Sequence, residues 1–521
     1  MKIEIKDKNV TVVGIARSGI GAANLLSELG ANVTVTDIKT KEELKDSIPG
    51  LDPSVRLVLG GHPEDIFVSA DMLVVSPGVP LDIPPIADAK SRGVPVIGEF
   101  ELAYQIATQS IEQAGFLAVT GTNGKSTTTV LLDFMMKKGG FRTVLGGNIG
   151  NALTGEILKI VSSQQSAVSS QTNTERGLSQ IYGHPPQADR IGTVPESIDL
   201  RLKTIDYIVA EVSSFQLESI KDFRPKVATI LNITPDHLDR YHSFEEYSNA
   251  KARIFENQKE DDFLVLNWDD PATMKVKSEK VKVKSKKPRI VYFSRKEEVE
   301  GLYFKDGMIY CNFPPMMGTA PILPPLAGKS KTVPSVPLIR ADEIKIKGVH
   351  NLENAMAASA MALIANCPLE TVIDSLREFP GLEHRLEFVK EINAVRYFND
   401  SKGTNVGAVM KSLESFIEPI ILIAGGRDKA GDFSQLRHLV RDKVKTLVLI
   451  GEASEKIKMA LGDLTETVMA QDLREAVRIS CSMAVKGDVV LLSPACASFD
   501  MFVNFEDRGR QFKKIVMEMN S

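Results

Sequence analysis

The chain has 521 residues, more than one hydrophobic core normally supports, so we expect several domains. Hydrophobic residues make up 43% and charged residues 25%, which is typical of a globular α/β protein, and the net charge of −4 argues against broad nucleic-acid binding. Four widely separated cysteines without a CxxC pair argue against a disulfide scaffold or a zinc site, and no apolar run predicts a membrane span. These features predict a cytoplasmic protein with neither a nucleic-acid nor a membrane partner.

The first unit begins with a strand, a glycine turn, a helix and a second strand over residues 10–37. Ala16 stands where the dinucleotide motif GxGxxG needs its second glycine, so this βαβ unit favours a nucleotide other than NAD. Asp37 ends the second strand, where it can accept a hydrogen bond from a sugar hydroxyl or a base N–H. Gly78, in a later Ser-Pro-Gly turn, allows a ligand to approach the backbone, although an ordinary tight turn explains it as well.

The second unit begins with "FLAVTGTNGKSTTTVLL", residues 116–132, which predicts a strand, a glycine turn and a helix. The usual phosphate loop has a glycine at the position of Val119, and here Gly121 follows instead. Gly-Lys-Ser also occurs by chance, but this context favours a loop that binds nucleotide phosphates. Lys125 would neutralise phosphate charge there, and the Ser126 hydroxyl would bind Mg²⁺.

Two polar side chains follow neighbouring apolar strands of this unit. Glu211 ends the strand 205–210, and a buried glutamate is costly unless it is paired or liganded, so a role on Mg²⁺ is favoured over a surface position. His237 lies just beyond the next strand, where open α/β sheets bind ligands. The residues alone leave the role of His237 undecided.

Two segments look inserted, at about 162–197 and 314–337, and their polar or proline-rich composition predicts long surface loops. The lysine run from Lys275 to Lys287 alternates with Val and Ser, which predicts a solvated strand edge rather than a nucleic-acid patch. A third unit starts near residue 381, and its apolar strands separated by helical stretches predict another parallel sheet.

Taken together, the motifs of the second unit resemble, in order, those of the Mur ligase family of ATP-dependent amide ligases. The matching segments are "TGTNGKST" (120–127), "GGNIG" (146–150), "EVSSFQLE" (211–218), "NITPDHLDRY" (232–241), "YSNAKARIF" (247–255), "GVHNLENAMAA" (348–358) and "GLEHRLE" (381–387). The resemblance covers nearly the whole chain except the two insert-like segments. It implies three domains: a Rossmann-like domain at 1–105, a central P-loop-type ATPase domain at 106–381 and a C-terminal Rossmann-like domain at 382–521.

Within the family, the third unit resembles the branch that adds D-glutamate. The segments that carry this resemblance are "NDSKGTNVGA" (399–408), "GGRDKAGDFS" (425–434) and "LLSPACASFDMFVNFEDRGRQF" (491–512). The resemblance implies that a monomer joins D-glutamate to UDP-N-acetylmuramoyl-L-alanine through an acyl phosphate, as a step in peptidoglycan precursor synthesis.

The resemblance also implies roles for individual residues. The expected ATP-binding residues are Gly121, Thr122, Asn123, Gly124, Lys125, Ser126, Thr127, Asn351, Asn354, Arg385, Asp400 and Lys402. The expected residues for the uridine nucleotide are Arg17, Ser18, Asp37, Gly78 and Asn148. Those for D-glutamate are Thr404, Lys429, Ser498 and Phe505. Two Mg²⁺ ions would be held by Ser126, Glu211, His237 and Lys251, with Lys251 carbamylated, and the catalytic residues would be Lys125, His237 and Lys251.

Rival interpretations remain at this point. A sister ligase that adds another amino acid, or a folate polyglutamate ligase, would share the central motifs and differ in the third unit. A nucleotide-binding regulator with an inactive site is a rival of another class, but the presence of Lys125, Glu211, His237 and Lys251 argues against it.

Overall fold

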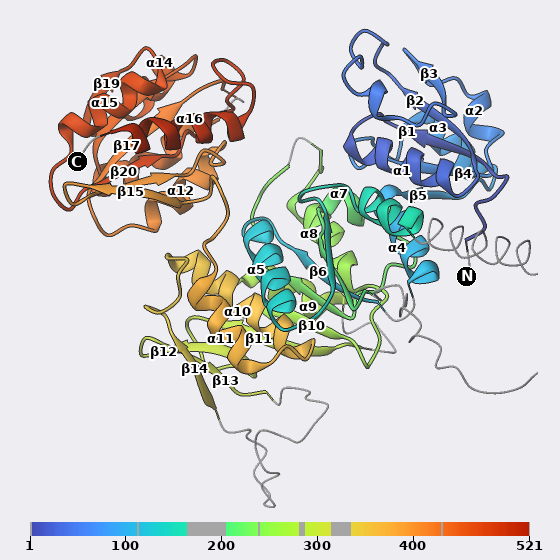
Figure 1. Ribbon diagram of the computed structural model, residues 1–521, viewed down its shortest axis with the longest axis horizontal. Helices are drawn as coiled ribbons and strands as arrows, with labels where there is room; N and C mark the ends of the chain where they lie inside the picture. The colour runs from blue at the N-terminus through green and yellow to red at the C-terminus, as the bar shows by residue number, and fades with distance from the viewer. Residues whose placement is uncertain are drawn as a thin grey trace, which may run out of the picture. The chain divides into compact units, whose positions relative to one another are not determined.

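The computed structural model describes residues 3–111, 114–163, 205–237, 240–280, 287–313, 335–428 and 431–519. These residues form three sheets, each with helices packed on it, which confirms the expected three-domain α/β class (Figure 1). The chain separates into two compact units, one of Met1–Ile339 with Asn354–Ser375 and one of Arg340–Glu353 with Leu376–Ser521. The two insert-like segments lie almost entirely outside the described residues.

The N-terminal sheet is parallel and has the strand order β3-β2-β1-β4-β5. Its strands are β1 (Asn9–Val13), β2 (Asn32–Asp37), β3 (Arg56–Leu59), β4 (Met72–Val75) and β5 (Val96–Gly98). Its helices are α1 (Arg17–Glu28), η1 (Ile48–Gly50), α2 (Asp65–Val68), α3 (Pro84–Ser91) and α4 (Glu99–Ser110). Residues of α1 and α4 join one core cluster, and those of α2 and α3 join another. The strand order reverses between β1 and β4, and ligands of open α/β sheets bind outside such a point.

The central sheet has the order β14-β13-β12-β11-β10-β9-β6-β8-β7, and β12 and β13 form an antiparallel pair. Its strands are β6 (Gly115–Thr120), β7 (Thr143–Gly147), β8 (Tyr207–Glu211), β9 (Val227–Ile230), β10 (Phe263–Asn267), β11 (Arg289–Ser294), β12 (Gly301–Lys305), β13 (Met308–Cys311) and β14 (Val336–Arg340). Because β8, β6 and β9 are parallel neighbours, the segments that follow them begin at one edge of the sheet.

The helices of the central region are α5 (Lys125–Lys138), α7 (Ser214–Leu217), α8 (Phe244–Ala252), η2 (Arg253–Phe255), α9 (Pro271–Lys280), α10 (Val349–Ile364) and α11 (Leu369–Glu378). Helix α5 packs on β6, β7 and β8. The Phe223 ring lies 4.9 Å from that of Phe100 and 5.9 Å from that of Phe116, and aromatic pairs at such separations stabilise a core. This cluster joins α4 to the central sheet in one hydrophobic core.

The lysine run from Lys275 to Lys287 was predicted as a strand edge, and this prediction is wrong for Lys275–Lys280, which belong to α9 (Pro271–Lys280). Residues 281–286 of the run lie outside the described residues. Proline at the first helical position favours a helix start. Lys275 pairs with Glu279 one turn later at 3.9 Å, and Val276 is buried, so the polar and apolar residues take opposite faces of a helix. Alternation with Val suggested a strand, but in the described part of the run Val276 is buried on one face of a helix.

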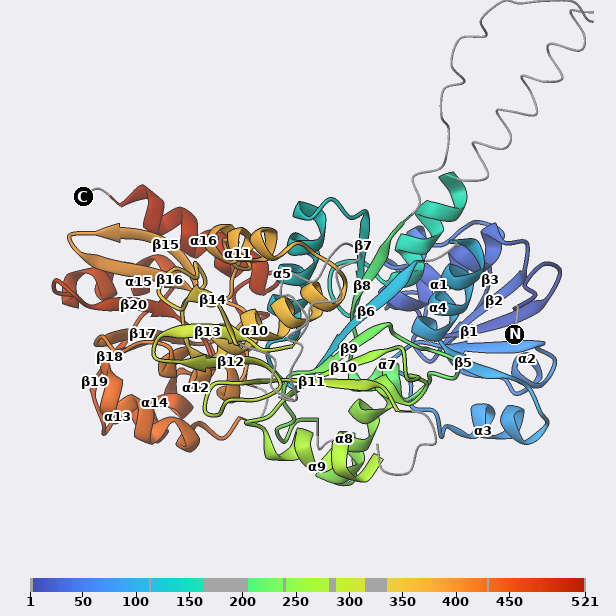
Figure 2. The ribbon, with the colours of Figure 1, turned by 90° about the horizontal axis from the view of Figure 1, so that it is seen from below.

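The C-terminal sheet has the order β15-β16-β20-β17-β18-β19, with β15 antiparallel to β16. Its strands are β15 (Glu387–Ile392), β16 (Val395–Asn399), β17 (Ile420–Gly425), β18 (Val444–Ile450), β19 (Glu466–Met469) and β20 (Val489–Leu492). Its helices are α12 (Val406–Glu414), η3 (Phe433–Leu436), α13 (Arg437–Lys443), α14 (Ser454–Leu461), α15 (Leu473–Met483) and α16 (Phe505–Glu518). Helices α12 to α14 cover one face and α15 and α16 the other, in two separate core clusters (Figure 2). Among the described residues, no helix is long and apolar enough to span a membrane.

Candidate functional site

The phosphate-loop candidate connects the end of β6 to the start of α5. Gly121 has φ +152° and Gly124 has φ +83°, so both glycines adopt backbone conformations that disfavour other residues. A Cβ atom on Gly124 would lie 2.2 Å from Oδ1 of Asn354, which shows how closely α10 approaches the loop. The loop therefore has the strand–turn–helix geometry that the sequence predicts, with N–H groups of the first turn of α5 at its end.

The segment after β9 holds this loop in place. The Asn123 N–H donates to Oδ1 of Asn232 at 2.8 Å, and Nδ2 of Asn232 donates to the Asn123 carbonyl at 3.2 Å. The Thr122 N–H donates to the Asn232 carbonyl at 2.9 Å, and the Thr122 hydroxyl lies 3.2 Å from that of Tyr247. These bonds hold the loop in place through protein contacts alone.

Two lysines converge on one backbone oxygen of the loop. Nζ of Lys125 and Nζ of Lys251 each donate to the Gly121 carbonyl at 2.9 Å. Burial, together with the neighbouring charge of Lys125, lowers the pKa of Lys251 well below its usual value. Nζ of Lys251 also lies 4.6 Å from the centre of the Tyr247 ring, and burial raises the pKa of that phenol to about 12. The lowered pKa of Lys251 leaves Lys125 as the main positive charge of this pair for a polyanionic ligand.

Glu211 has the features expected of a magnesium ligand. It ends β8 and is only 2% exposed, and its Oε1 accepts from Nδ2 of Asn148 at 2.7 Å. Within the described residues its Oε2 is buried and has no hydrogen-bond partner. An orphaned carboxylate oxygen at a strand end is costly unless a cation or donor completes it, and Mg²⁺ prefers oxygen ligands. The residues present therefore fit Mg²⁺, with Ser126, buried at the start of α5, as a second oxygen donor.

His237 follows β9 and has φ +54°, an uncommon backbone conformation for a residue other than glycine. Its ring is about half exposed and packs edge-on against Phe215, with the ring centres 4.9 Å apart. Nε2 lies 3.6 Å from a carboxylate oxygen of Asp236. The imidazole is thus positioned by an aromatic neighbour while one side stays open to solvent.

The residues expected to bind the uridine nucleotide lie near the reversal point of the N-terminal sheet, except Asn148. Arg17 and Ser18 open α1 directly after the β1 turn, and Gly78 is exposed in the turn after β4. Both carboxylate oxygens of Asp37 accept backbone N–H groups, from Ile15 at 2.7 Å and Lys39 at 2.9 Å. Asp37 therefore shapes the glycine turn in addition to any contact with a ligand. Asn148 lies instead beside Glu211 in the central sheet.

Asp400 and Lys402 lie in the segment that follows β16 in the second unit. Burial raises the pKa of Asp400 to about 6, although its Oδ2 accepts from the hydroxyls of Ser412 at 2.6 Å and Ser493 at 2.7 Å. Lys402 lies over the Phe505 ring, with Nζ 4.9 Å from its centre. Arg385 is half-buried and Ser498 is fully buried in the same unit. Thr404 follows in the same segment as Lys402, and Lys429 lies outside the described residues.

Asn351 and Asn354, which the resemblance assigns to ATP, both lie on α10. Nδ2 of Asn351 donates to the Lys347 carbonyl at 2.8 Å. Oδ1 of Asn354 accepts from the Thr128 hydroxyl of α5 at 3.2 Å. Their roles in binding nucleotide stay predictions.

Comparison with known proteins gives one consistent result across the chain. Residues 8–98 match the Mur ligase MurD-like N-terminal domain, residues 119–362 the Mur ligase middle domain and residues 384–496 the Mur ligase glutamate ligase domain. A UDP-N-acetylmuramoylalanine–D-glutamate ligase of Citrifermentans bemidjiense is 42% identical over 516 residues, which cover 99% of this chain and 98% of that protein. The chain belongs to the Mur ligase family.

Other relatives give the same family. A UDP-N-acetylmuramoylalanine–D-glutamate ligase of Caldanaerobacter subterraneus subsp. tengcongensis is 40% identical over 523 residues. The match covers 99% of this chain and 100% of that protein. A MurF ligase from Thermotoga maritima in complex with ADP shares the fold with a TM-score of 0.54 and 15% identity, over 99% of this chain and 96% of that one. The MurC ligase of Thermotoga maritima has a TM-score of 0.52 at 19% identity, and the match covers 98% of this chain and 99% of that one.

Sequence reasoning overlooked some residues that build this Mur ligase site. Asn232 opens a segment that was matched as a motif, yet its two side-chain bonds to the loop could not be foreseen without the β6–β9 pairing. Glu99 starts α4, is buried, and accepts from both the N–H and the hydroxyl of Thr154, at 3.1 and 2.8 Å. Two glutamates in "GEFELAYQ" were the available signal, because charged residues inside an apolar helix pattern are expensive to bury.

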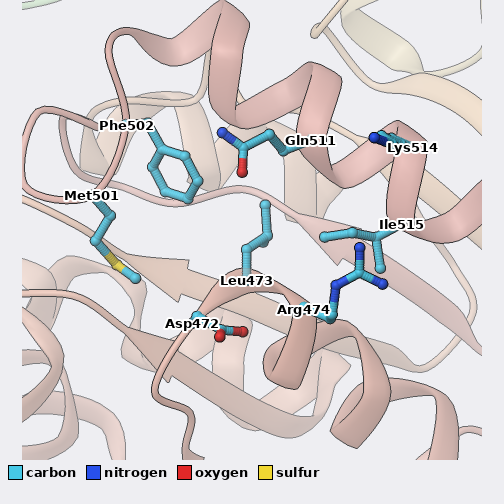
Figure 3. Close-up of a pocket in the computed structure, with 8 residues that line it drawn as sticks. All are labelled: Asp472, Leu473, Arg474, Met501, Phe502, Gln511, Lys514 and Ile515. Atoms are coloured by element: carbon cyan, nitrogen blue, oxygen red, sulfur yellow. The ribbon is translucent and has the colours of Figure 1, made fainter.

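Two further features of the Mur ligase C-terminal domain lie outside the predicted residues. Among the described residues one group has metal-ligating potential, Glu383, His384 and Glu387, but Lys513 contacts both carboxylates and supplies the cation there. A cavity of about 430 Å³ lies between α15 and α16, lined by Leu473, Arg474, Phe502 and Lys514 among others (Figure 3). None of the residues expected to bind substrate lines it.

We predict that Gly124→Ala weakens ATP binding, because alanine would be strained at φ +83° and would collide with Asn354. Such strain costs about 1–3 kcal/mol, and if the loop shifts to relieve it, ATP affinity falls by about ten- to a hundredfold. Titration calorimetry with a non-hydrolysable ATP analogue measures this. Gly140→Ala is the matched control, since Gly140 has φ +87° at the other end of α5 with open space around it. Equal affinities for the two variants would contradict the prediction.

We predict a pH-dependent gain in stability for Asp400→Asn. The folded pKa of Asp400, about 6, lies above its reference value of 3.8, so the wild type loses stability as the pH rises between these values. The shift corresponds to about 3 kcal/mol at full ionisation. Scanning calorimetry should show Asp400→Asn gaining stability over the wild type between about pH 4 and pH 7.5. The exposed Asp442→Asn is the control, and a pH-independent difference for Asp400→Asn would refute the burial argument.

Proposed function

We propose that this Mur ligase uses ATP to join D-glutamate to UDP-N-acetylmuramoyl-L-alanine, releasing ADP and phosphate in peptidoglycan precursor synthesis. The observation that carries the proposal is the cluster of Lys125, Lys251 and Glu211 around the 121–127 loop. It combines positive charge for phosphates with an incompletely coordinated carboxylate for a metal. The full-length similarity to proteins named as D-glutamate ligases supports the choice of amino acid.

The chemistry requires an activated carboxylate, because a carboxylate and an amine do not condense in water. The alanyl carboxylate oxygen attacks the γ-phosphorus of ATP, and ADP leaves. The D-glutamate amine then attacks the carbonyl carbon of the acyl phosphate, a proton leaves the nitrogen, and phosphate departs. Both steps depend on bringing anions together and stabilising developing negative charge.

The residues around the loop are suited to these tasks. Lys125 and the N–H groups of residues 121–127 hold the ATP phosphates, and the Asn232 bonds keep that loop in its binding shape. Mg²⁺ held by Ser126 and Glu211, with a second ion near His237 and Lys251, would neutralise charge on the transferred phosphoryl group. Asn148 orients the Glu211 carboxylate through its 2.7 Å bond.

The remaining residues are assigned to the other substrates and to the rest of ATP. The uridine nucleotide is bound by Arg17, Ser18, Asp37 and Gly78, with Asn148 nearby in the central sheet. ATP is bound, in addition to the 121–127 loop, by Asn351, Asn354, Arg385, Asp400 and Lys402. D-glutamate is bound by Thr404, Lys429, Ser498 and Phe505, with the Lys429 ammonium facing a carboxylate. The reaction takes place in the cytoplasm, and the protein acts as a monomer.

Lys251 is carbamylated in the active protein, since an ammonium group cannot bind Mg²⁺. The neutral amine attacks the carbon of CO₂ and loses a proton, which leaves a carbamate with oxygen ligands. The lowered pKa of Lys251 favours this reaction because it increases the neutral fraction of the amine near neutral pH. The hydrogen bond to the Gly121 carbonyl holds the nitrogen beside the loop.

The proposed function predicts that phosphate release requires ATP, Mg²⁺, UDP-N-acetylmuramoyl-L-alanine and D-glutamate together. L-Glutamate, L-alanine and diaminopimelate serve as parallel controls in a coupled phosphate assay of the purified protein. Release with another amino acid instead would make this chain a sister ligase. Absence of release with every amine, despite ATP binding, would favour the inactive regulator.

We predict that Lys251→Ala lowers turnover by at least about a hundredfold, the scale for losing one group that stabilises transition-state charge. In ¹³CO₂-equilibrated protein, the wild type should show a carbamate carbon signal by NMR, and Lys251→Ala should lack it. The exposed Lys259→Ala, on the turn after η2, should keep both the signal and the activity. A carbamate signal that persists in Lys251→Ala would exclude Lys251 as the modified residue.

A further inference from the structure

Arg508, on the first turns of α16, has the largest side chain among those that are fully buried in the described residues. Its guanidinium donates hydrogen bonds to neutral oxygens, and no carboxylate is among its hydrogen-bond partners within the described residues. Burial lowers its pKa to about 10, so the group stays charged at neutral pH. The carboxylates of Asp500 and Asp400 favour its charge without hydrogen-bonding it. Burying a cation with no hydrogen-bonded anion is costly, and an apolar side chain would fill a core position at lower cost. This cost calls for a role other than stability.

The guanidinium joins two segments that follow neighbouring strands. Nη2 donates to the Ser401 carbonyl at 2.9 Å, and Nε donates to the Ser401 hydroxyl at 3.0 Å. Longer bonds run to the carbonyls of Cys496 at 3.3 Å and Ala497 at 3.4 Å. Ser401 follows β16 and Cys496 follows β20, and these strands pair in parallel. One planar group thus sets the separation of two loops at the carboxyl edge of the sheet.

A third strand end joins the same cluster. Arg427 follows β17, and β17 pairs with β20. Arg427 and Ala497 exchange two backbone hydrogen bonds, each of 3.0 Å. Gly426 has φ +127°, and a Cβ atom there would lie 2.2 Å from the Ala497 carbonyl and 3.2 Å from Nη1 of Arg508. Glycine is therefore required for the β17 segment to reach the guanidinium.

The proposed D-glutamate residues lie directly on these segments. Thr404 is three residues beyond Ser401, and Ser498 is next to Ala497. The Ser401 hydroxyl, which accepts from Arg508, donates to the Phe505 carbonyl at 2.8 Å. The Ser498 carbonyl in turn accepts from the N–H of Phe502 at 2.9 Å. Movement of the guanidinium would therefore shift the Thr404, Ser498 and Phe505 positions together.

We propose that Arg508 is a positioning residue that assembles the D-glutamate pocket by holding the loops after β16, β20 and β17 at fixed separation. The inference rests on the proposed function, because it presumes that D-glutamate binds at these loops. Arg508 acts through the backbone and does not itself contact the substrate. Lysine, with one ammonium in place of a planar fork, cannot hold the Ser401 and Cys496 segments at once.

The test is steady-state kinetics of Arg508→Lys and Ser401→Ala in the full-length protein. A displacement of about 1 Å in a binding group costs up to about a hundredfold in rate. We therefore expect KM for D-glutamate to rise at least about tenfold in Arg508→Lys and to rise less in Ser401→Ala. KM for UDP-N-acetylmuramoyl-L-alanine, proposed to bind the other unit, should stay unchanged. Arg510→Lys, on the exposed face of α16, is the matched control and should behave like the wild type.

The outcomes separate this inference from its premise. A fall in kcat with both KM values unchanged would mean that Arg508 only maintains the folded fraction, and it would overturn the inference. Equal increases in both KM values would overturn it as well. If Arg508→Lys does not fold, Ser401→Ala decides alone, because it removes one acceptor and leaves the cation in place. Failure of the wild-type protein to use D-glutamate would instead defeat the proposed function, whatever the variants do.

Discussion

Parallel strands that end at one edge of a sheet bring together residues that are far apart in sequence, and most of the candidate site depends on this constraint. The loop after β6, Glu211 at the end of β8 and Asn232 after β9 meet because these strands are neighbours. In the second unit, β16, β20 and β17 bring three more loops together in the same way. Strand order, more than any single motif, therefore decides which side chains can act together.

Backbone carbonyls hold the important basic side chains in both units. Lys125 and Lys251 share the Gly121 oxygen, and Arg508 donates to the carbonyls of Ser401, Cys496 and Ala497. A carbonyl dipole fixes the position of a cation but does not cancel its charge. Around the phosphate loop the remaining positive charge is available for phosphate groups, whereas at Arg508 the benefit is the alignment of loops. The same interaction thus serves binding in one place and positioning in another.

The predicted motifs indicated the right elements more reliably than the roles of single residues. Residues 116–132 and the strand ending at Glu211 form as expected, because long apolar strands and glycine turns are strongly determined by local sequence. The first part of the lysine run, Lys275–Lys280, was misread because alternation with a single described valine, Val276, does not distinguish a strand from a helix. Asp37 and Asn148 were both expected to bind a nucleotide. Asp37 accepts a hydrogen bond from the Ile15 N–H, and Asn148 donates one to the Glu211 carboxylate. A polar side chain at a strand end can serve either purpose, and its sequence context is the same in both cases.

The sequence by itself determined the fold class, the family and the location of the phosphate loop, since glycine spacing, apolar strands and ordered motifs are local properties of the chain. Tertiary structure decided which partners each polar group has. It brought Asn232 to Asn123 across 109 positions and Arg508 to Ser401 across 107. It also buried Lys251 beside Lys125, which sets the lowered pKa of its amine. Burial and charge proximity depend on three-dimensional neighbours, and for this reason the chemistry of the site could not be deduced from the order of the residues alone.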